Sequence, residues 1–223
     1  MKKIFTSLFL CSAIISSYMA QTRYLDPVFD SVVVSPEIQY SSNLSVLLEP
    51  ATGMLVPTGA NPLVPHLAFD LYQPYGDSLT ERPLIIYLHT GTFAPIFLNG
   101  NPTGSRQDFA TTTMCKEYAK RGFVVANIEY RLGWNPNLLT ESERATSLMK
   151  AVYRAIQDTK SAVRFFNDDY QNNSNSYGID TSKIVLSGQG SGGWVALGYS
   201  AVDKLAEIQL DKSRVQNIMR QTY

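Results

Sequence analysis

The chain reads Lys-Ile-Val-Leu-Ser-Gly-Gln-Gly-Ser-Gly-Gly-Trp from Lys183 to Trp194, and this stretch decides the fold. Strand-forming residues run into a turn dense in glycine, and the apolar run Val195–Val202 follows. This order predicts a strand, a sharp turn and a helix. Such a turn can lift one side chain above the end of a parallel sheet, at backbone angles that only small neighbours tolerate.

The serine of this turn stands in an unusual position. A turn that presents a nucleophile has the pattern Gly-x-Ser-x-Gly, with the serine at its apex. When the strand sets the frame, the three fixed positions hold Gly188, Gly190 and Gly192, so the apex residue Gly190 has no side chain. When Ser191 sets the frame, Gln189 falls where a small residue is needed. The pattern therefore predicts the turn and leaves its nucleophile open.

Composition narrows the class of protein. A chain of 223 residues that is 44% apolar can bury one sizeable core, and we expect one globular domain. The formal net charge is zero, and no basic run outside the first three residues suggests a nucleic acid or an anionic membrane as partner. A small molecule or a neutral polymer is the more natural partner.

Residues 1–20 have the layout of a secretory signal peptide. Lys2 and Lys3 precede an apolar run, Ile4–Ile15, and Ala20 offers a small residue for cleavage. Serines interrupt the run, so a membrane-spanning anchor is not predicted. We therefore expect a secreted, periplasmic or cell-surface protein.

The cysteines and histidines predict neither a disulfide nor a metal site. Cys11 lies in the leader, so Cys115 has no partner in the mature chain and is interpreted as a packing residue on a helix face. His66 and His89 each lack a second ligand at a usable spacing, and no metal or other cofactor is predicted. His66 is interpreted as a surface or packing residue.

Residues 21–66 differ in composition from the rest of the chain. This segment is polar and rich in proline, and it is interpreted as an N-terminal extension. The short apolar patches at Val32–Val34 and Ser45–Leu48 predict edge strands within it. The remainder, residues 67–223, is assigned to a single α/β domain.

Strands and helices alternate through that domain. Strands are predicted from continuous or alternating apolar runs, and helices from apolar residues at three- and four-residue steps. In chain order the predicted elements are strand Leu67–Tyr72, strand Pro83–His89, helix Gln107–Arg121, strand Phe123–Ile128, helix Glu141–Asn167 and strand Ile184–Ser187. This alternation predicts a mostly parallel, doubly wound sheet with helices on both faces.

Four stretches together resemble the α/β-hydrolase superfamily. Tyr87–Phe93 is similar to its Leu-His-Gly-Gly-x-Phe loop, and Asn127–Leu132 to its Asn-Tyr-Arg-Leu strand end. Arg154–Asp158 resembles Ala-x-Gln-Asp on the helix before the turn, and Gly178–Leu186 resembles Gly-Ile-Asp-x-x-Arg-Ile. Within the superfamily, the likeness is to secreted carboxylesterases and to the feruloyl or acetyl-xylan esterases related to hormone-sensitive lipases. It covers about residues 67–202.

This resemblance implies a set of site residues. The backbone N–H groups of Gly91, Thr92 and Ser191 would form an oxyanion hole, where each donor stabilises the developing negative charge by about 3 to 4 kcal/mol. His89 would orient the loop that carries two of these donors. Ser191 is the candidate nucleophile, although Gly190 holds the usual position of that residue.

The partners of a catalytic serine are not found in the sequence. No histidine follows Ser191, and a serine hydroxyl needs an imidazole to take its proton and an acid to orient that imidazole. Asp203 directly precedes the amphipathic segment Lys204–Met219 and Asp211 lies within it, and both are interpreted as solvated helix charges. Either the chain is an N-terminal fragment of a longer hydrolase, incomplete at its C-terminus, or the triad has been abandoned; we favour the fragment.

Three functions follow from these alternatives. The leading hypothesis is a secreted hydrolase of small or carbohydrate-linked carboxylic esters that is active only at full length, so the 223-residue chain alone is expected to be inactive. The alternative is a catalytically inactive hydrolase-fold module that binds a glycan or a protein, because Gly190 occupies the apex. A phosphate-binding loop is the weakest reading, since Gly188–Gly193 is not followed by Lys-Ser/Thr. The oligomeric state is not predicted.

Overall fold

A computed structural model describes residues 22–43, 66–100 and 102–202. Several predictions lie outside these residues: the signal peptide, the edge strand Ser45–Leu48, and the amphipathic segment Lys204–Met219 with Asp203 and Asp211. Within the described residues, no helix is both long and apolar enough to cross a bilayer.

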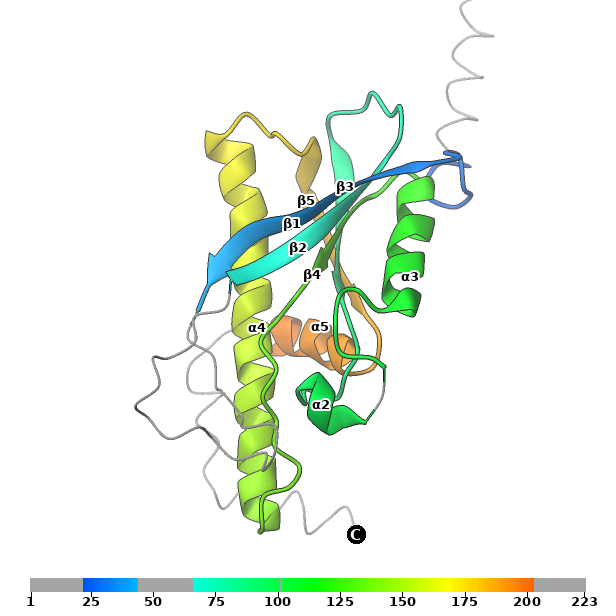
Figure 1. Ribbon diagram of the computed structural model, residues 1–223. Helices are drawn as coiled ribbons and strands as arrows, with labels where there is room; N and C mark the ends of the chain where they lie inside the picture. Colours follow the sequence, from blue (N-terminus) through cyan, green and yellow to red (C-terminus); the bar gives the residue numbers. More distant parts are fainter. Residues whose placement is uncertain (1–21, 44–65, 101, 203–223) are drawn as a thin grey trace, which may run out of the picture.

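The described residues form one five-stranded sheet with the order β1-β2-β4-β3-β5. Figure 1 shows the strands crossing the middle of the molecule. Their bounds are β1 Val32–Ser42, β2 His66–Pro74, β3 Arg82–Leu88, β4 Val124–Ile128 and β5 Ile179–Gly188. β3 pairs in parallel with both β4 and β5, whereas β2 runs antiparallel to β1 and to β4. Four of these strands therefore point the same way, and β2 alone points the other way.

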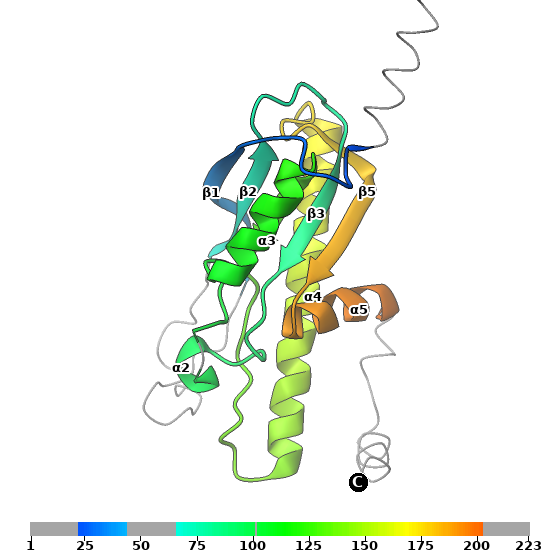
Figure 2. The same cartoon turned by 90° about the vertical axis from the view of Figure 1, so that its right-hand side faces the viewer.

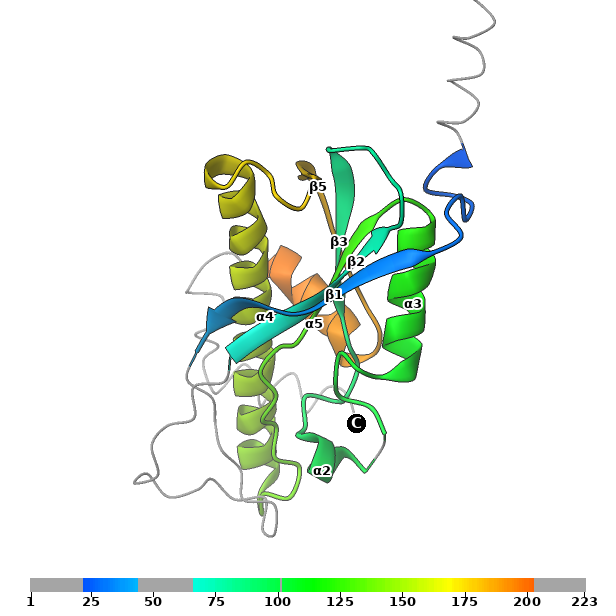
Figure 3. The ribbon, with the colours of Figure 1, turned by 45° about the horizontal axis from the view of Figure 1, so that its top comes forward.

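Helices cover both faces of the sheet, as predicted. The helices are α2 Ile96–Asn99, α3 Phe109–Lys120, α4 Glu141–Asn172 and α5 Ser191–Ala201. Figure 2 shows α3 on one face and α4 on the other, with α5 at the end of the sheet toward which β3 and β5 point. Figure 3 shows that α5 lies on the same side as α4, and the two helices are in contact. The doubly wound α/β fold is confirmed.

Alternation along β3 divides the core into two layers. Leu84, Ile86 and Leu88 are fully buried on the face covered by α4, where they pack in the same cluster as Phe166. Ile85 and Tyr87 point to the other face, toward α3. Because both faces are covered, the strand is apolar without interruption, which is why it could be recognised in the sequence.

Cys115 belongs to the α3 layer. Its side chain is fully buried and forms no disulfide with any described residue. Burial raises the pKa of its thiol well above the usual value, because the charged thiolate is poorly solvated there. The structure thus places Cys115 in a packing position, as the sequence suggested.

Several elements are longer than the sequence patterns predicted. β5 begins at Ile179, five residues before the predicted start at Ile184. β1 continues past Pro36 because the register shifts between Ser35 and Ile38, which lets an edge strand accommodate the proline. α4 extends to Asn172, and its first turn carries a capping box in which Thr140 and Glu143 bond each other's backbone N–H.

Candidate active site

The turn between β5 and α5 takes the form predicted from its glycines. Gly190 has φ 56° and ψ −120°, a backbone conformation that side-chain-bearing residues rarely adopt, and α5 begins at Ser191. A Cβ atom at Gly192 would lie 2.1 Å from the carbonyl oxygen of Leu88, so only glycine allows this close passage over the end of β3. The structure therefore places Gly190, not Ser191, at the apex.

Ser191 faces inward from this turn. Its side chain belongs to a residue only 6% exposed, and its Oγ lies 3.3 Å from the hydroxyl oxygen of Tyr130. Tyr130 donates its single proton to the carbonyl of His89 at 2.7 Å, so in the second contact Ser191 is the donor. In this arrangement the hydroxyl of Ser191 stabilises the base of the turn. A nucleophilic role for Ser191 stays a prediction and requires that its side chain turn outward.

Tyr130 is itself buried, with 1% of its surface exposed. Burial raises the pKa of its hydroxyl far above the usual value, and the hydrogen bond with Ser191 opposes that shift. The group is therefore neutral at ordinary pH. It links the loop after β3 to the first residue of α5.

His89 holds the loop after β3 through both of its ring nitrogens. Nδ1 lies 2.6 Å from the carbonyl oxygen of Thr90, and Nε2 lies 3.1 Å from a carboxylate oxygen of Glu129. The ring is fully buried and stacks on Tyr130 with 4.3 Å between the ring centroids. Neither nitrogen is left to take a proton from a serine, so this geometry suits a loop-orienting role and not that of a general base.

The backbone of this loop is held in an uncommon conformation. Thr92 and Phe93 both have positive φ, at 55° and 61°, although neither is glycine. Gly91 has φ 130°, and a Cβ atom there would lie 2.4 Å from the Cα atom of Gly104. Strain of this kind persists where the surroundings impose it, and it often marks a functional loop.

Three amide groups around the turn remain available to a ligand. The backbone N–H groups of Gly91, Thr92 and Ser191 donate no hydrogen bond to any part of the chain that the structure describes. They belong to two turns that touch, because Thr90 packs against Gly190. These are the three donors that the resemblance implied for an oxyanion hole, and their role stays a prediction.

Two of the motif stretches noted in the sequence meet behind the site. The guanidinium of Arg131 forms a buried ion pair with Asp158, with Nη2 and Oδ1 2.8 Å apart, and the backbone N–H of Arg131 donates to the same carboxylate. Asp158 is fully buried in α4. The pair fastens the end of β4, and with it Glu129 and Tyr130, to the long helix.

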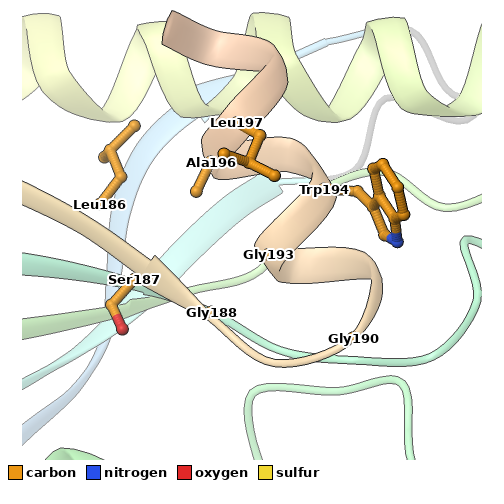
Figure 4. Close-up of a pocket in the computed structure, with 8 residues that line it drawn as sticks. All are labelled: Leu186, Ser187, Gly188, Gly190, Gly193, Trp194, Ala196 and Leu197. Carbon is orange, nitrogen blue, oxygen red and sulfur yellow. The ribbon is translucent and has the colours of Figure 1, made fainter.

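A pocket of about 500 Å³ borders the apex. Its lining residues come from the end of β5 and the first turns of α5, namely Leu186, Ser187, Gly188, Gly190, Gly193, Trp194, Ala196 and Leu197. Figure 4 shows Leu186 and Ala196 on opposite sides of this space and Trp194 on the side of the turn. Trp194 and Leu197 are 69% and 67% exposed, so an apolar group bound here would cover surface that now faces solvent.

Three contributors to this site were missed in the sequence. Glu129 and Tyr130 lie in a stretch that was used only as a family likeness, and the contact between Thr90 and Gly190 was not foreseen. Thr90 stands where the superfamily loop Leu-His-Gly-Gly-x-Phe has a glycine, and Gly190 stands where the Gly-x-Ser-x-Gly turn has its serine. The two departures lie 100 positions apart in the sequence, and only the fold brings them together. Among the described residues, no group of three or more His, Cys, Asp or Glu side chains could hold a metal ion.

A mostly parallel sheet, a glycine turn at the end of β5 and a loop after β3 that meets it define an α/β-hydrolase. The chain matches the family described as BD-FAE over residues 69–221, and it belongs to this family of esterase-like α/β-hydrolases. The likeness to hydrolases of the esterase type is thereby confirmed. No curated protein is similar enough to count as a match.

Solved structures of esterases are similar to part of this chain. Esterase 2 from the Planctomycetes species Thermogutta terrifontis is 25% identical over 60% of this chain and 39% of its own, with a TM-score of 0.44. The hyperthermophilic esterase from the archaeon Pyrobaculum calidifontis is 19% identical over 83% of this chain and 42% of its own, also with a TM-score of 0.44. The chain thus spans about 40% of the length of these esterases.

Proposed function

We propose that the protein hydrolyses carboxylic esters at the site formed by the loop after β3 and the turn after β5. The observation that carries this proposal is the set of three amide donors on two touching turns, with no partner among the described residues. Donors fixed in this way can stabilise the oxyanion that forms when an ester carbonyl is attacked. Membership of an esterase-like family supports the same reaction class.

Ser191 remains the candidate nucleophile for this reaction. It would add through Oγ to the ester carbonyl carbon, after its hydroxyl leaves Tyr130 and turns toward the apex. A general base would take the hydroxyl proton and pass it to the departing alcohol, and water would then hydrolyse the acyl-serine. A general base is not found among the described residues, because His89 uses both nitrogens. The base and the acid of the triad are therefore expected from parts of the protein that the structure does not describe.

The substrate and the location of the enzyme are also proposals. The pocket beside Gly190 favours an ester with one apolar group, and the enzyme is proposed to act outside the cytoplasm on small or carbohydrate-linked esters. The basis for export is the leader-like composition of residues 1–20. N-terminal sequencing of the exported protein should then find Gln21 as its first residue.

The test is hydrolysis of an activated butyryl ester by the full protein and by two serine variants. Ser191→Ala should lower kcat/KM by several powers of ten, as loss of a serine nucleophile does. Ser200→Ala, an exposed serine on the same helix, is the matched control and should leave the rate unchanged. An unchanged rate in Ser191→Ala would remove this residue from the mechanism.

A second candidate function is a hydrolase-fold module that binds its ligand without cleaving it. Gly190 at the apex and the inward position of the Ser191 hydroxyl favour this candidate. It predicts no ester turnover and no labelling of Ser191 by a serine-directed phosphonate. Covalent labelling of Ser191, read by peptide mass spectrometry, would contradict it.

A further inference from the structure

The side chain of Thr90 occupies the place of the missing side chain at the apex. A Cβ atom built on Gly190 would lie 2.3 Å from Oγ1 of Thr90 and 3.2 Å from its Cβ. Atoms that are not bonded to each other do not approach to 2.3 Å, so residue 190 and residue 90 cannot both carry their side chains in this arrangement. The volume above the turn is filled from the loop after β3 and not from the turn itself.

The hydroxyl of Thr90 is also free to meet a ligand. Thr90 is partly exposed, and its Oγ1 forms no hydrogen bond within the described part of the chain. Its backbone is held in place, because its carbonyl oxygen lies 2.6 Å from Nδ1 of the buried His89. A donor on a fixed backbone thus stands next to the amides of Gly91 and Thr92. By contrast, the hydroxyl of Ser191 is buried and bonded to Tyr130.

We propose that Thr90 is the ligand-binding hydroxyl of this site, and that it acts with the amides of Gly91, Thr92 and Ser191 to bind an acyl oxygen. Three backbone N–H groups and one hydroxyl, none with a hydrogen-bond partner among the described residues, suit a negatively charged or strongly polarised oxygen. The ligand class is a carboxylate with an apolar chain, or the acyl group of the corresponding ester, whose chain would lie in the pocket beside Gly190. The inference rests on the same site as the proposed hydrolysis but needs no turnover.

Binding of hexanoate to the full protein tests this proposal, followed by the amide signals in ¹H–¹⁵N spectra. Thr90→Val keeps the shape of the side chain and removes the hydroxyl, and it should raise the Kd about tenfold, as loss of one hydrogen bond to a charged group does. Thr90→Ser restores the hydroxyl and should bind within about threefold of the wild type. Thr113→Val, on the exposed side of α3, is the control for the exchange itself and should bind as the wild type does.

Two results would overturn the proposal. One is equal affinity of Thr90→Val and the wild type. The other is hexanoate binding that leaves the amide signals of Gly91, Thr92 and Ser191 unmoved. Binding without any ester turnover would refute the proposed hydrolysis and support this inference. Ester turnover that is lost in Ser191→Ala, together with hexanoate binding that is unchanged in Thr90→Val, would support the proposed hydrolysis and refute this inference.

A thermal-unfolding cycle tests the shared volume separately. Gly190→Ala should lower the Tm in the presence of Thr90, because the new Cβ meets the threonine side chain. In a protein that also carries Thr90→Gly, the drop in Tm caused by Gly190→Ala should be at most half as large. The drop that remains reflects the positive φ of residue 190. If Gly190→Ala costs the same Tm in both backgrounds, the two residues do not compete for this space.

Discussion

The two turns that meet at the candidate site are held by different means. The turn after β5 is built from glycines, and close approach between backbones holds it, as where Gly192 passes over Leu88. The loop after β3 carries side chains at positive φ, and buried side chains hold it, above all His89. One turn tolerates no added atoms, and the other depends on atoms already present.

This difference is seen at the point where the two turns touch, because Thr90 of one turn lies where a side chain at residue 190 of the other would stand. The loop after β3 has Thr90 at the first glycine of the superfamily pattern Leu-His-Gly-Gly-x-Phe. The turn after β5 has Gly190 at the serine of the pattern Gly-x-Ser-x-Gly. Thr90 fills space that a side chain at residue 190 would need. Close-packed regions accept substitutions that conserve volume more readily than those that add or remove it.

The largest expected effect comes from filling the turn after β5. Gly192→Ala places a Cβ atom 2.1 Å from the carbonyl oxygen of Leu88 in the buried end of β3, whereas the same change at Gly193 meets its nearest atom at 3.5 Å. We expect Gly192→Ala to lower the free energy of unfolding by about 3 kcal/mol or more. Gly193→Ala should change it by less than about 1 kcal/mol, because alanine also favours helix. Urea unfolding measures the free energy of unfolding of both variants. Similar losses in Gly192→Ala and Gly193→Ala would show that the turn is not held by close contact between backbones.

A smaller effect is expected from loosening the loop after β3. His89→Phe keeps an aromatic ring against Tyr130 and removes both hydrogen bonds, to Thr90 and to Glu129. The free energy of unfolding should fall by about 1 to 3 kcal/mol, because the carbonyl of Thr90 and the carboxylate of Glu129 lose their donor. Faster hydrogen exchange should appear at Ala94, whose N–H donates to the carbonyl of Gly91 within the loop, but not in α3. An equal change of the exchange rate in the loop after β3 and in α3 would mean that His89 does not hold this loop.

The smallest effect concerns Tyr130, which joins both turns. Burial raises the pKa of its hydroxyl above the unfolded value of 10.0, so the folded state keeps this proton while the unfolded state begins to lose it. The resulting stability is fully present below pH 10 and is lost as the pH rises from there toward the folded pKa. A tyrosine that ionises only in the unfolded state lowers the free energy of unfolding by about 0.8 kcal/mol at pH 10.5, relative to its value well below pH 10. Tyr40 and Tyr72 have raised pKa values for the same reason and add to the loss.

Tyr130→Phe isolates the share of this residue. The variant should be less stable than the wild type at pH 8, because it lacks the bonds to His89 and Ser191. The difference should shrink by about 0.8 kcal/mol between pH 8 and pH 10.5. Parallel curves of unfolding free energy against pH for the two proteins would show that Tyr130 ionises equally in both states.

Local patterns were enough to predict most of the fold. The uninterrupted apolar run of β3, the stripe of apolar residues along α4 and the glycines of residues 188–192 each reflect a constraint that acts within a few residues. The exact extent of β1 was missed, because its continuation past Pro36 depends on a register shift against β2. The family and the three candidate amide donors were likewise within reach of the sequence.

The sequence by itself determined the doubly wound α/β architecture, the glycine turn and the loop that meets it, because each is written in neighbouring residues through backbone conformation and hydrophobic period. Only the tertiary structure decided which hydroxyl faces outward. Thr90 and Ser191 are both small hydroxyl-bearing residues beside glycine, and nothing local distinguishes them. The two side chains differ in position because Tyr130, from the segment after β4, holds Ser191 inward, while the bare Cα of Gly190 leaves room for Thr90.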